Sequence, residues 1–152
     1  MKRAVHRGQY IAYQTFEGPT SNAATVLLQH GLLSRRKSWE DVGYVDALTA
    51  NFNVITVDSL GHGDSDKPND ATFYARKQRA GDVVAVLDAE SITSVHYIGY
   101  SMGGWIGTGM ALHHPDRLTS LTIGGWDPVG GLSTVPAIGT FDDLFKFKRV
   151  AR

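Results

Sequence analysis

The 152-residue sequence contains no cysteine, which excludes disulfide bonds, thiolate-bound metals and thiol redox chemistry. It also has no excess of charge, because 15 Lys and Arg residues balance 15 Asp and Glu residues, and a nucleic-acid partner is therefore not expected. No run of 18 apolar residues is present, and the basic N-terminus lacks the apolar run of a signal peptide. We expect a soluble, cytoplasmic protein with no membrane partner.

The chain has the composition of an ordinary globular domain, with 42% hydrophobic and 20% charged residues. Alternating residues on both sides of Gly8 predict an N-terminal antiparallel hairpin. Short apolar runs predict four buried strands. The predicted strands are residues 4–7, 9–16, 25–29, 53–57, 95–98 and 118–123.

Three helices are predicted between successive apolar strands, over residues 39–50, around residues 80–87 and over residues 102–113. An alternation of strand and helix is typical of parallel strands joined by crossover helices. The predicted fold class is therefore α/β: a mostly parallel sheet led by an antiparallel hairpin, with helices on both faces. In such sheets ligands bind at the carboxyl ends of the strands.

A GxSxG sequence, Gly99 to Gly103, lies where the strand at 95–98 meets the helix at 102–113. Such a sharp turn holds the central Ser101 in a strained conformation, and glycines on both sides avoid collisions with neighbouring backbone. The Met102 amide then lies at the positive end of the helix, beside any oxyanion that develops. The amide of Leu32, in the loop after a neighbouring strand, is the natural second donor.

The chain resembles the α/β-hydrolase superfamily through GYSMGG at residues 99–104, HGLL at 30–33 and DSLGHGDSDKP at 58–68. The resemblance covers roughly residues 2–125 in the expected order and implies the serine-nucleophile, esterase-like branch. It implies Ser101 as nucleophile and Leu32 and Met102 as oxyanion donors.

The resemblance also implies an eight-stranded sheet, of which this sequence supplies about six strands. We expect residues 1–125 to form an incomplete N-terminal core and residues 126–152 to begin a truncated lid. The amphipathic stretch at 141–152 fits the first helix of that lid.

The identity of the nucleophile narrows the expected reaction. Superfamily members that open epoxides or displace halide use a carboxylate at this position, because its alkyl ester is hydrolysed at the carbonyl. A serine would form a stable ether instead. Ser101 therefore favours acyl transfer on a small ester or acyl substrate, with hydrolysis of carbon–carbon bonds or cofactor-free peracid formation as close alternatives.

A histidine base is not found at the expected place, because no histidine follows His114. His113 and His114 lie 12 and 13 residues beyond Ser101, or about 18 Å along one helix. His30 and His62 are interpreted as structural loop residues. The resemblance leaves Asp127, which directly follows the last predicted strand, as a candidate acid, and the alternative is a simple Asp-Pro turn.

No metal or cofactor is expected, although Asp58, His62, Asp64 and Asp66 include possible metal ligands. Two other interpretations of the whole sequence stay open. The chain is either a non-catalytic remnant that serves as a binding module, or one half of a split hydrolase. For a split hydrolase, the exposed edge of the sixth strand is the expected docking surface, and for the isolated chain the same edge is a candidate surface for self-association.

Overall fold

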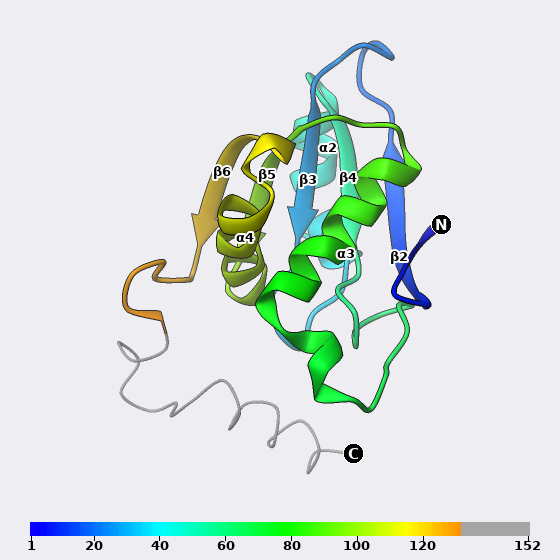
Figure 1. The fold of residues 1–152 in the computed structure, drawn as a ribbon. Helices are drawn as coiled ribbons and strands as arrows, with labels where there is room; N and C mark the ends of the chain where they lie inside the picture. Colours follow the sequence, from blue (N-terminus) through cyan, green and yellow to red (C-terminus); the bar gives the residue numbers. More distant parts are fainter. Residues whose placement is uncertain (132–152) are drawn as a thin grey trace.

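The computed structural model describes residues 1–131, which form one sheet with helices on both sides (Figure 1). The strands are β1 (Lys2–His6), β2 (Gln9–Phe16), β3 (Thr25–Gln29), β4 (Asn53–Val57), β5 (Val95–Tyr100) and β6 (Leu118–Gly124). The helices are α1 (Ser38–Asp41), α2 (Tyr44–Thr49), α3 (Arg76–Ala89) and α4 (Met102–His113), with short 3-10 turns η1 (Ala71–Tyr74) and η2 (Pro115–Arg117).

The strand order is β1-β2-β4-β3-β5-β6. The hairpin of β1 and β2 is antiparallel and joins β4 antiparallel, whereas β4, β3, β5 and β6 run parallel to one another. The order places β3 directly beside β5, with Gln29 opposite Gly99. As a result, the loops that follow these two strands begin side by side at one edge of the sheet.

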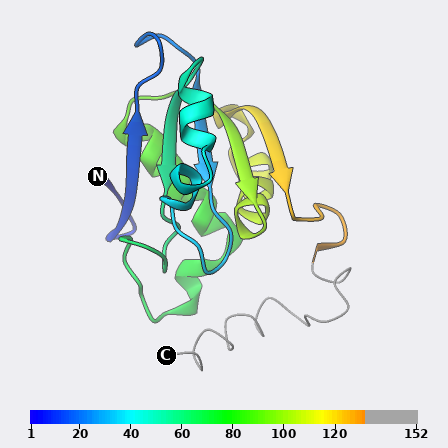
Figure 2. The same ribbon diagram turned by 180° about the vertical axis from the view of Figure 1, so that it is seen from behind.

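Each face of the sheet is covered by a different helix pair. Figure 1 shows α3 and α4 in front of the strands, and the view from behind shows the short cyan helices on the other face (Figure 2). The predicted α/β fold, with its hairpin, its parallel strands and helices on both faces, is confirmed.

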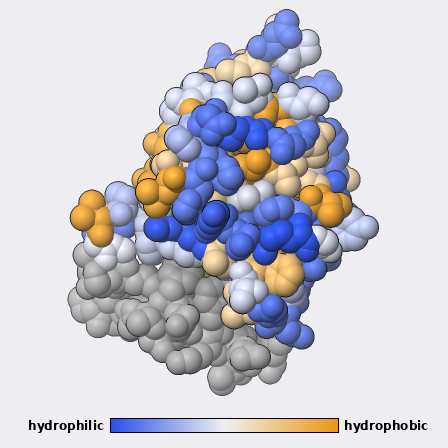
Figure 3. All heavy atoms as spheres, viewed as in Figure 1, coloured by the Kyte–Doolittle hydropathy of each residue, from blue (hydrophilic) through white to orange (hydrophobic). Residues whose placement is uncertain are grey.

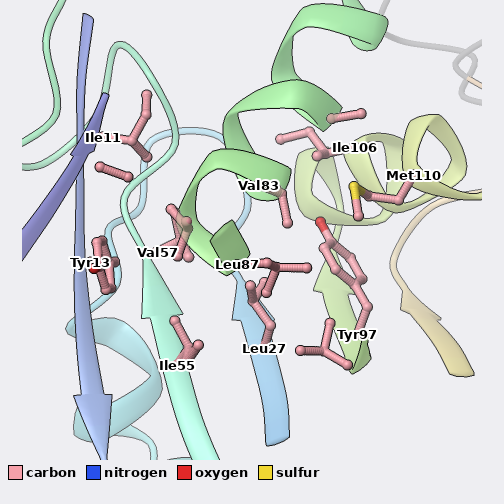
Figure 4. Close-up of a cluster of buried hydrophobic side chains, with 14 of the residues drawn as sticks. Ile11, Tyr13, Leu27, Ile55, Val57, Val83, Leu87, Tyr97, Ile106 and Met110 are labelled. Atoms are coloured by element: carbon pink, nitrogen blue, oxygen red, sulfur yellow. The ribbon is translucent and has the colours of Figure 1, made fainter. Parts of the chain in front are cut away.

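Strand residues alternate between the two faces, as the pleat of a strand requires. Leu27 and Ile55 join the larger core beneath α3 and α4, while Leu28 and Val54 join a smaller core beneath α2. Figure 4 shows the larger core, in which Tyr97 and Met110 lie between β5 and α4. The outer face of α3 and α4 is mainly hydrophilic, with apolar residues in separate small groups (Figure 3).

The single helix predicted over residues 39–50 is wrong in one respect. Gly43 has a φ of 82°, which ends α1 and begins α2 at a new angle. A positive φ interrupts a right-handed helix, and glycine adopts it at little cost. The apolar spacing of residues 42, 45 and 48 did not reveal this break.

The predicted bounds of the other elements are close to those observed. The helix at 102–113 and the strands at 25–29 and 53–57 are confirmed at both ends. Among the helices of residues 1–131, none has the length and hydropathy needed to cross a lipid bilayer. The lid helix predicted for 141–152 lies outside the described residues, as does most of the predicted segment 126–152.

Candidate active site

Ser101 lies between β5 and α4 with φ 53° and ψ −114°, a backbone conformation that residues other than glycine rarely adopt. Two hydrogen bonds hold this backbone. The Ser101 N–H donates to the carbonyl of Gly124 at the end of β6 (2.7 Å), and the Ser101 carbonyl accepts from the Trp105 N–H (3.1 Å). The neighbouring strand and the first turn of α4 thus maintain the strained turn that the motif predicts.

The glycines on either side of Ser101 lie against backbone. A Cβ on Gly99 would meet the carbonyl of Gly103 and would lie 2.7 Å from the Gly104 nitrogen. A Cβ on Gly103 would meet the carbonyl oxygen of Gln29 and would lie 2.8 Å from its carbonyl carbon. Real side chains do not come this close to backbone. Glycine at 103 therefore lets the start of α4 approach β3, and glycine at 99 lets the end of β5 lie against the first turn of α4.

The glycines further along α4 allow two kinds of close packing. A Cβ on Gly107 would lie 2.8 Å from both the Leu121 and Tyr97 side chains, so glycine there lets the helix lie close to the sheet. Gly109 instead faces α3, where a Cβ would lie 2.8 Å from Cγ of Arg76. At that position glycine allows close contact between two helices.

The loop after β3 lies directly against Ser101. A Cβ on Gly31 would lie 3.3 Å from Cβ of Ser101 and 3.3 Å from the Tyr100 carbonyl. Leu32 follows, and Leu33 has a positive φ of 63°. Within residues 1–131, the amides of Leu32 and Met102 have no hydrogen-bond acceptor, so both are available for a ligand oxygen beside Ser101.

His30 anchors the beginning of this loop. Its ring is buried, and its Nδ1 lies 2.7 Å from the Gly31 carbonyl while its Nε2 lies 3.1 Å from the Ser59 amide nitrogen. Because the Ser59 N–H must donate, Nε2 is the acceptor and Nδ1 carries the proton. Both ring nitrogens of His30 are therefore used within the fold, as a structural loop residue requires.

Asp58 anchors the other end of the loop. Its carboxylate is fully buried, accepts the Arg36 N–H at 2.7 Å and the Asp64 N–H at 3.0 Å, and forms an ion pair with the Arg36 guanidinium. The same guanidinium pairs with Asp64 at 2.8 Å and holds the pKa of that carboxyl below its ordinary value. Arg36 was not identified from the sequence, because no motif marks it.

The possible metal ligands are occupied by other contacts. Asp66 accepts the Tyr10 N–H at 2.8 Å, and Asp58 is used as described above. His62 is buried with its Nδ1 3.3 Å from the Leu60 carbonyl. Within residues 1–131, no group of three His, Asp or Glu residues has the arrangement of a metal site.

Arg79 on α3 is a second residue that sequence reasoning missed. It is buried, donates to Oγ of Ser59, and lies with its guanidinium carbon 5.0 Å from the centre of the Tyr74 ring. Burial lowers the pKa of Arg79 to about 10, while the Asp82 carboxylate opposes that shift. No motif in the sequence marks Arg79 as a residue that reaches the loop after β4.

A proton acceptor for Ser101 is not found in the described part of the chain. None of the six histidines hydrogen-bonds to Ser101 there, and His113 and His114 lie at the far end of α4. Asp127 uses Oδ1 to accept the N–H groups of Val129 (2.8 Å) and Gly130 (3.0 Å), and these bonds lower its pKa. That geometry is the Asp-Pro turn, and the role of Asp127 as catalytic acid stays a prediction.

Comparisons with known proteins agree with this geometry. The family model described as alpha/beta hydrolase fold matches residues 24–145. A curated protein of Caulobacter segnis named as a carbamate hydrolase, RutD, is 35% identical over 117 residues, which cover 76% of this chain and 43% of that protein.

Two solved structures are similar in both sequence and fold. The enol-lactonase from Burkholderia xenovorans LB400 is 30% identical with a TM-score of 0.72, and the match covers 79% of this chain and 45% of that one. Est816, described as an N-acyl homoserine lactone degrading enzyme, is 33% identical with a TM-score of 0.69, over 80% of this chain and 44% of that one. The chain thus spans less than half the length of each relative. From its fold, the strained turn at Ser101 and these matches, we conclude that the chain belongs to the α/β-hydrolase fold family.

Proposed function

We propose that this chain carries the nucleophile and the oxyanion hole of a serine hydrolase that acts on carboxylic esters or related acyl compounds. The observation that carries the proposal is the strained Ser101 turn, held between the Gly124 carbonyl and the first turn of α4. A fold that only bound ligands would have no need of this conformation at a serine. The relatives named above support hydrolase chemistry in general.

The proposed reaction proceeds through an acyl-enzyme. Ser101 Oγ attacks the substrate carbonyl, and the N–H groups of Leu32 and Met102 donate to the oxyanion that forms. The leaving group departs with a proton, and water then hydrolyses the acyl ester on Ser101. Each proton transfer needs a base, and within residues 1–131 no histidine hydrogen-bonds to Ser101.

Esters, including cyclic esters, are the substrate class we favour. Two relatives are described as lactone-degrading enzymes, and a lactone presents the same carbonyl and alkoxide leaving group as an open ester. Serine as nucleophile fits such substrates and does not fit epoxides, because attack on an epoxide carbon would leave a stable ether.

Without a base hydrogen-bonded to Ser101, this chain alone should turn over activated esters poorly. Oxyanion stabilisation and binding by themselves accelerate reactions by about 10³ to 10⁴ over water in a comparable triad enzyme. We therefore expect slow reaction at Ser101 rather than rapid turnover.

The experiment that tests the proposal is covalent labelling with a fluorophosphonate probe, followed by mass-spectrometric mapping of the modified residue. The expected result is slow labelling of Ser101 in the folded chain and none at that peptide in Ser101→Ala. Absence of any label at Ser101 after long incubation would overturn the proposal and favour the non-catalytic remnant.

A further inference from the structure

The loop that carries Leu32 is held at both ends by two consecutive residues of another loop. At its beginning, His30 accepts the N–H of Ser59 at 3.1 Å. At its end, the N–H of Arg36 donates to the side chain of Asp58 at 2.7 Å. Residues 58 and 59 directly follow β4, so the position of the loop beside Ser101 depends on the neighbouring strand β4 and not on β3 alone.

Asp58 makes the stronger of these two attachments. Its carboxylate is fully buried, and hydrogen bonds from backbone N–H groups to an ionised carboxylate are roughly twice as strong as neutral ones. The guanidinium of Arg36 balances the buried charge. A Cβ at Gly63 would overlap this carboxylate, so glycine at 63 lets the second loop close over it.

We propose that Asp58 is a positioning residue for the oxyanion hole, which fixes the place of the Leu32 amide through its bond to the Arg36 N–H. The inference rests on the proposed function, because it assigns Leu32 as an oxyanion donor. Asp58 itself touches neither Ser101 nor, in this account, the substrate. It acts through the loop at 30–36, whose backbone includes the positive φ of Leu33.

Both oxygens of Asp58 are needed as acceptors. Oδ1 accepts from Arg36 N–H, while Oδ2 accepts from Asp64 N–H and from the Arg36 side chain. An asparagine of nearly the same shape has only one acceptor atom, so its NH₂ group would face an N–H donor. Asp58→Asn should therefore release one end of the loop without leaving a cavity.

The test measures amide hydrogen exchange and the rate of fluorophosphonate labelling at Ser101 on the same proteins. For Asp58→Asn we expect exchange across residues 30–37 to rise about tenfold, with exchange in β3 as in the wild type. The maximal labelling rate should fall by about 10² because the donor is misplaced, while the probe concentration at half-maximal rate stays the same.

Asp82→Asn is the matched control. Asp82 is also a buried carboxylate that pairs with an arginine, Arg7 at 2.9 Å, but it lies on α3 and makes no contact with residues 30–37. This variant should loosen α3 and the N-terminal hairpin and leave exchange at 30–37 unchanged. A rise at 30–37 as large as that in Asp58→Asn would show a global effect and overturn the proposal.

An exchange rate at residues 30–37 that is the same in Asp58→Asn as in the wild type would also overturn the proposal. If that variant does not fold, Arg36→Gln serves in its place, because it leaves the buried Asp58 carboxylate without its balancing guanidinium and so weakens the attachment of Asp58 to residue 36. Raised exchange at 30–37 in Arg36→Gln supports the proposal, and unchanged exchange contradicts it. The hydrogen-exchange result does not depend on any reaction at Ser101. If Ser101 of the wild-type protein never reacts with the probe, only the proposed function is overturned.

Discussion

On its β3 side, Ser101 lies against a loop that hydrogen bonds tie to the segment after β4, whereas on its β6 side the candidate acid Asp127 turns its carboxylate to its own turn. His30 and Asp58 make the attachments of the first side, and both are buried. On the second side, the hydrogen bonds that the Asp127 carboxylate accepts among residues 1–131 come from the N–H groups two and three residues ahead of it.

Under the proposed function, this difference separates two parts of a catalytic site. The β3 side carries the backbone amides proposed to stabilise a developing oxyanion, on a loop that cannot shift without breaking several contacts. The β6 side offers neither a base nor an acid that is oriented toward Ser101 by a bond in the described part of the chain. Residues 1–131 thus hold the groups proposed for stabilisation of charge, and none of their described hydrogen bonds joins Ser101 to a group that could transfer its proton.

The largest loss of stability is expected where the start of α4 meets β3. Gly103→Ala places a methyl group against the Gln29 carbonyl, and we expect it to lower the free energy of unfolding by about 3 kcal/mol. Urea unfolding followed by circular dichroism measures this. Gly124→Ala is the control, because its Cβ would meet only Tyr100 at 3.4 Å. A urea midpoint for Gly103→Ala equal to that of the wild type would refute the close approach of α4 to β3.

A smaller loss is expected when the beginning of the loop is released. His30→Ala leaves the buried Ser59 N–H without its acceptor and should cost about 2 kcal/mol. His96→Ala, at the opposite end of the sheet, removes an exposed bond to Ser120 and a ring contact with Phe52, and it serves as the comparison in the same urea experiment. Equal losses in the two variants would contradict a special role for His30.

The β6 side gives a prediction about association. Leu118, Leu121 and Ile123 are half-buried, and β6 has β5 as its one neighbour in the described sheet. We expect the mass measured by light scattering to rise with concentration and to rise less in Thr122→Lys, because lysine blocks strand-edge pairing. Ala47→Lys on α2 should associate as the wild type does. A monomer at all concentrations would remove the edge as a docking surface.

The smallest effect concerns Asp127 and pH. Its folded pKa is lowered by the Val129 and Gly130 N–H groups, so the turn is stabilised above the ordinary carboxyl pKa and loses that support as pH falls through the lowered value. The amide resonances of residues 129 and 130 should move only once the pH falls below the ordinary carboxyl pKa of about 3.9. In Asp127→Asn they should stay constant, and an equal movement there would assign the change to another group.

Much of this fold was predictable because its signals are local. Short apolar runs predicted the strands. The glycines around Ser101 predicted the strained turn, since the spacing of these glycines has a steric cause within the same few residues. Gly43 escaped prediction because a positive φ leaves no mark on apolar spacing.

The attachments of the oxyanion loop were harder to predict. Arg36 and Arg79 reach residues 22 and 20 positions away in the sequence, and only the three-dimensional arrangement of β3, β4 and α3 brings them there. Asp58 stood out in the sequence as a possible metal ligand. Its partners are the Arg36 guanidinium and two backbone N–H groups, and no sequence motif marks any of these contacts.

The central claim of the proposal is that backbone geometry, and not a base within residues 1–131, makes Ser101 reactive. Its most direct test is the rate of fluorophosphonate labelling at Ser101 with and without added imidazole, an external base. The account predicts slow labelling that imidazole accelerates, with no such acceleration in Ser101→Ala. Rapid, stoichiometric labelling of Ser101 without imidazole would contradict it and would show that a histidine of this chain already serves as the base.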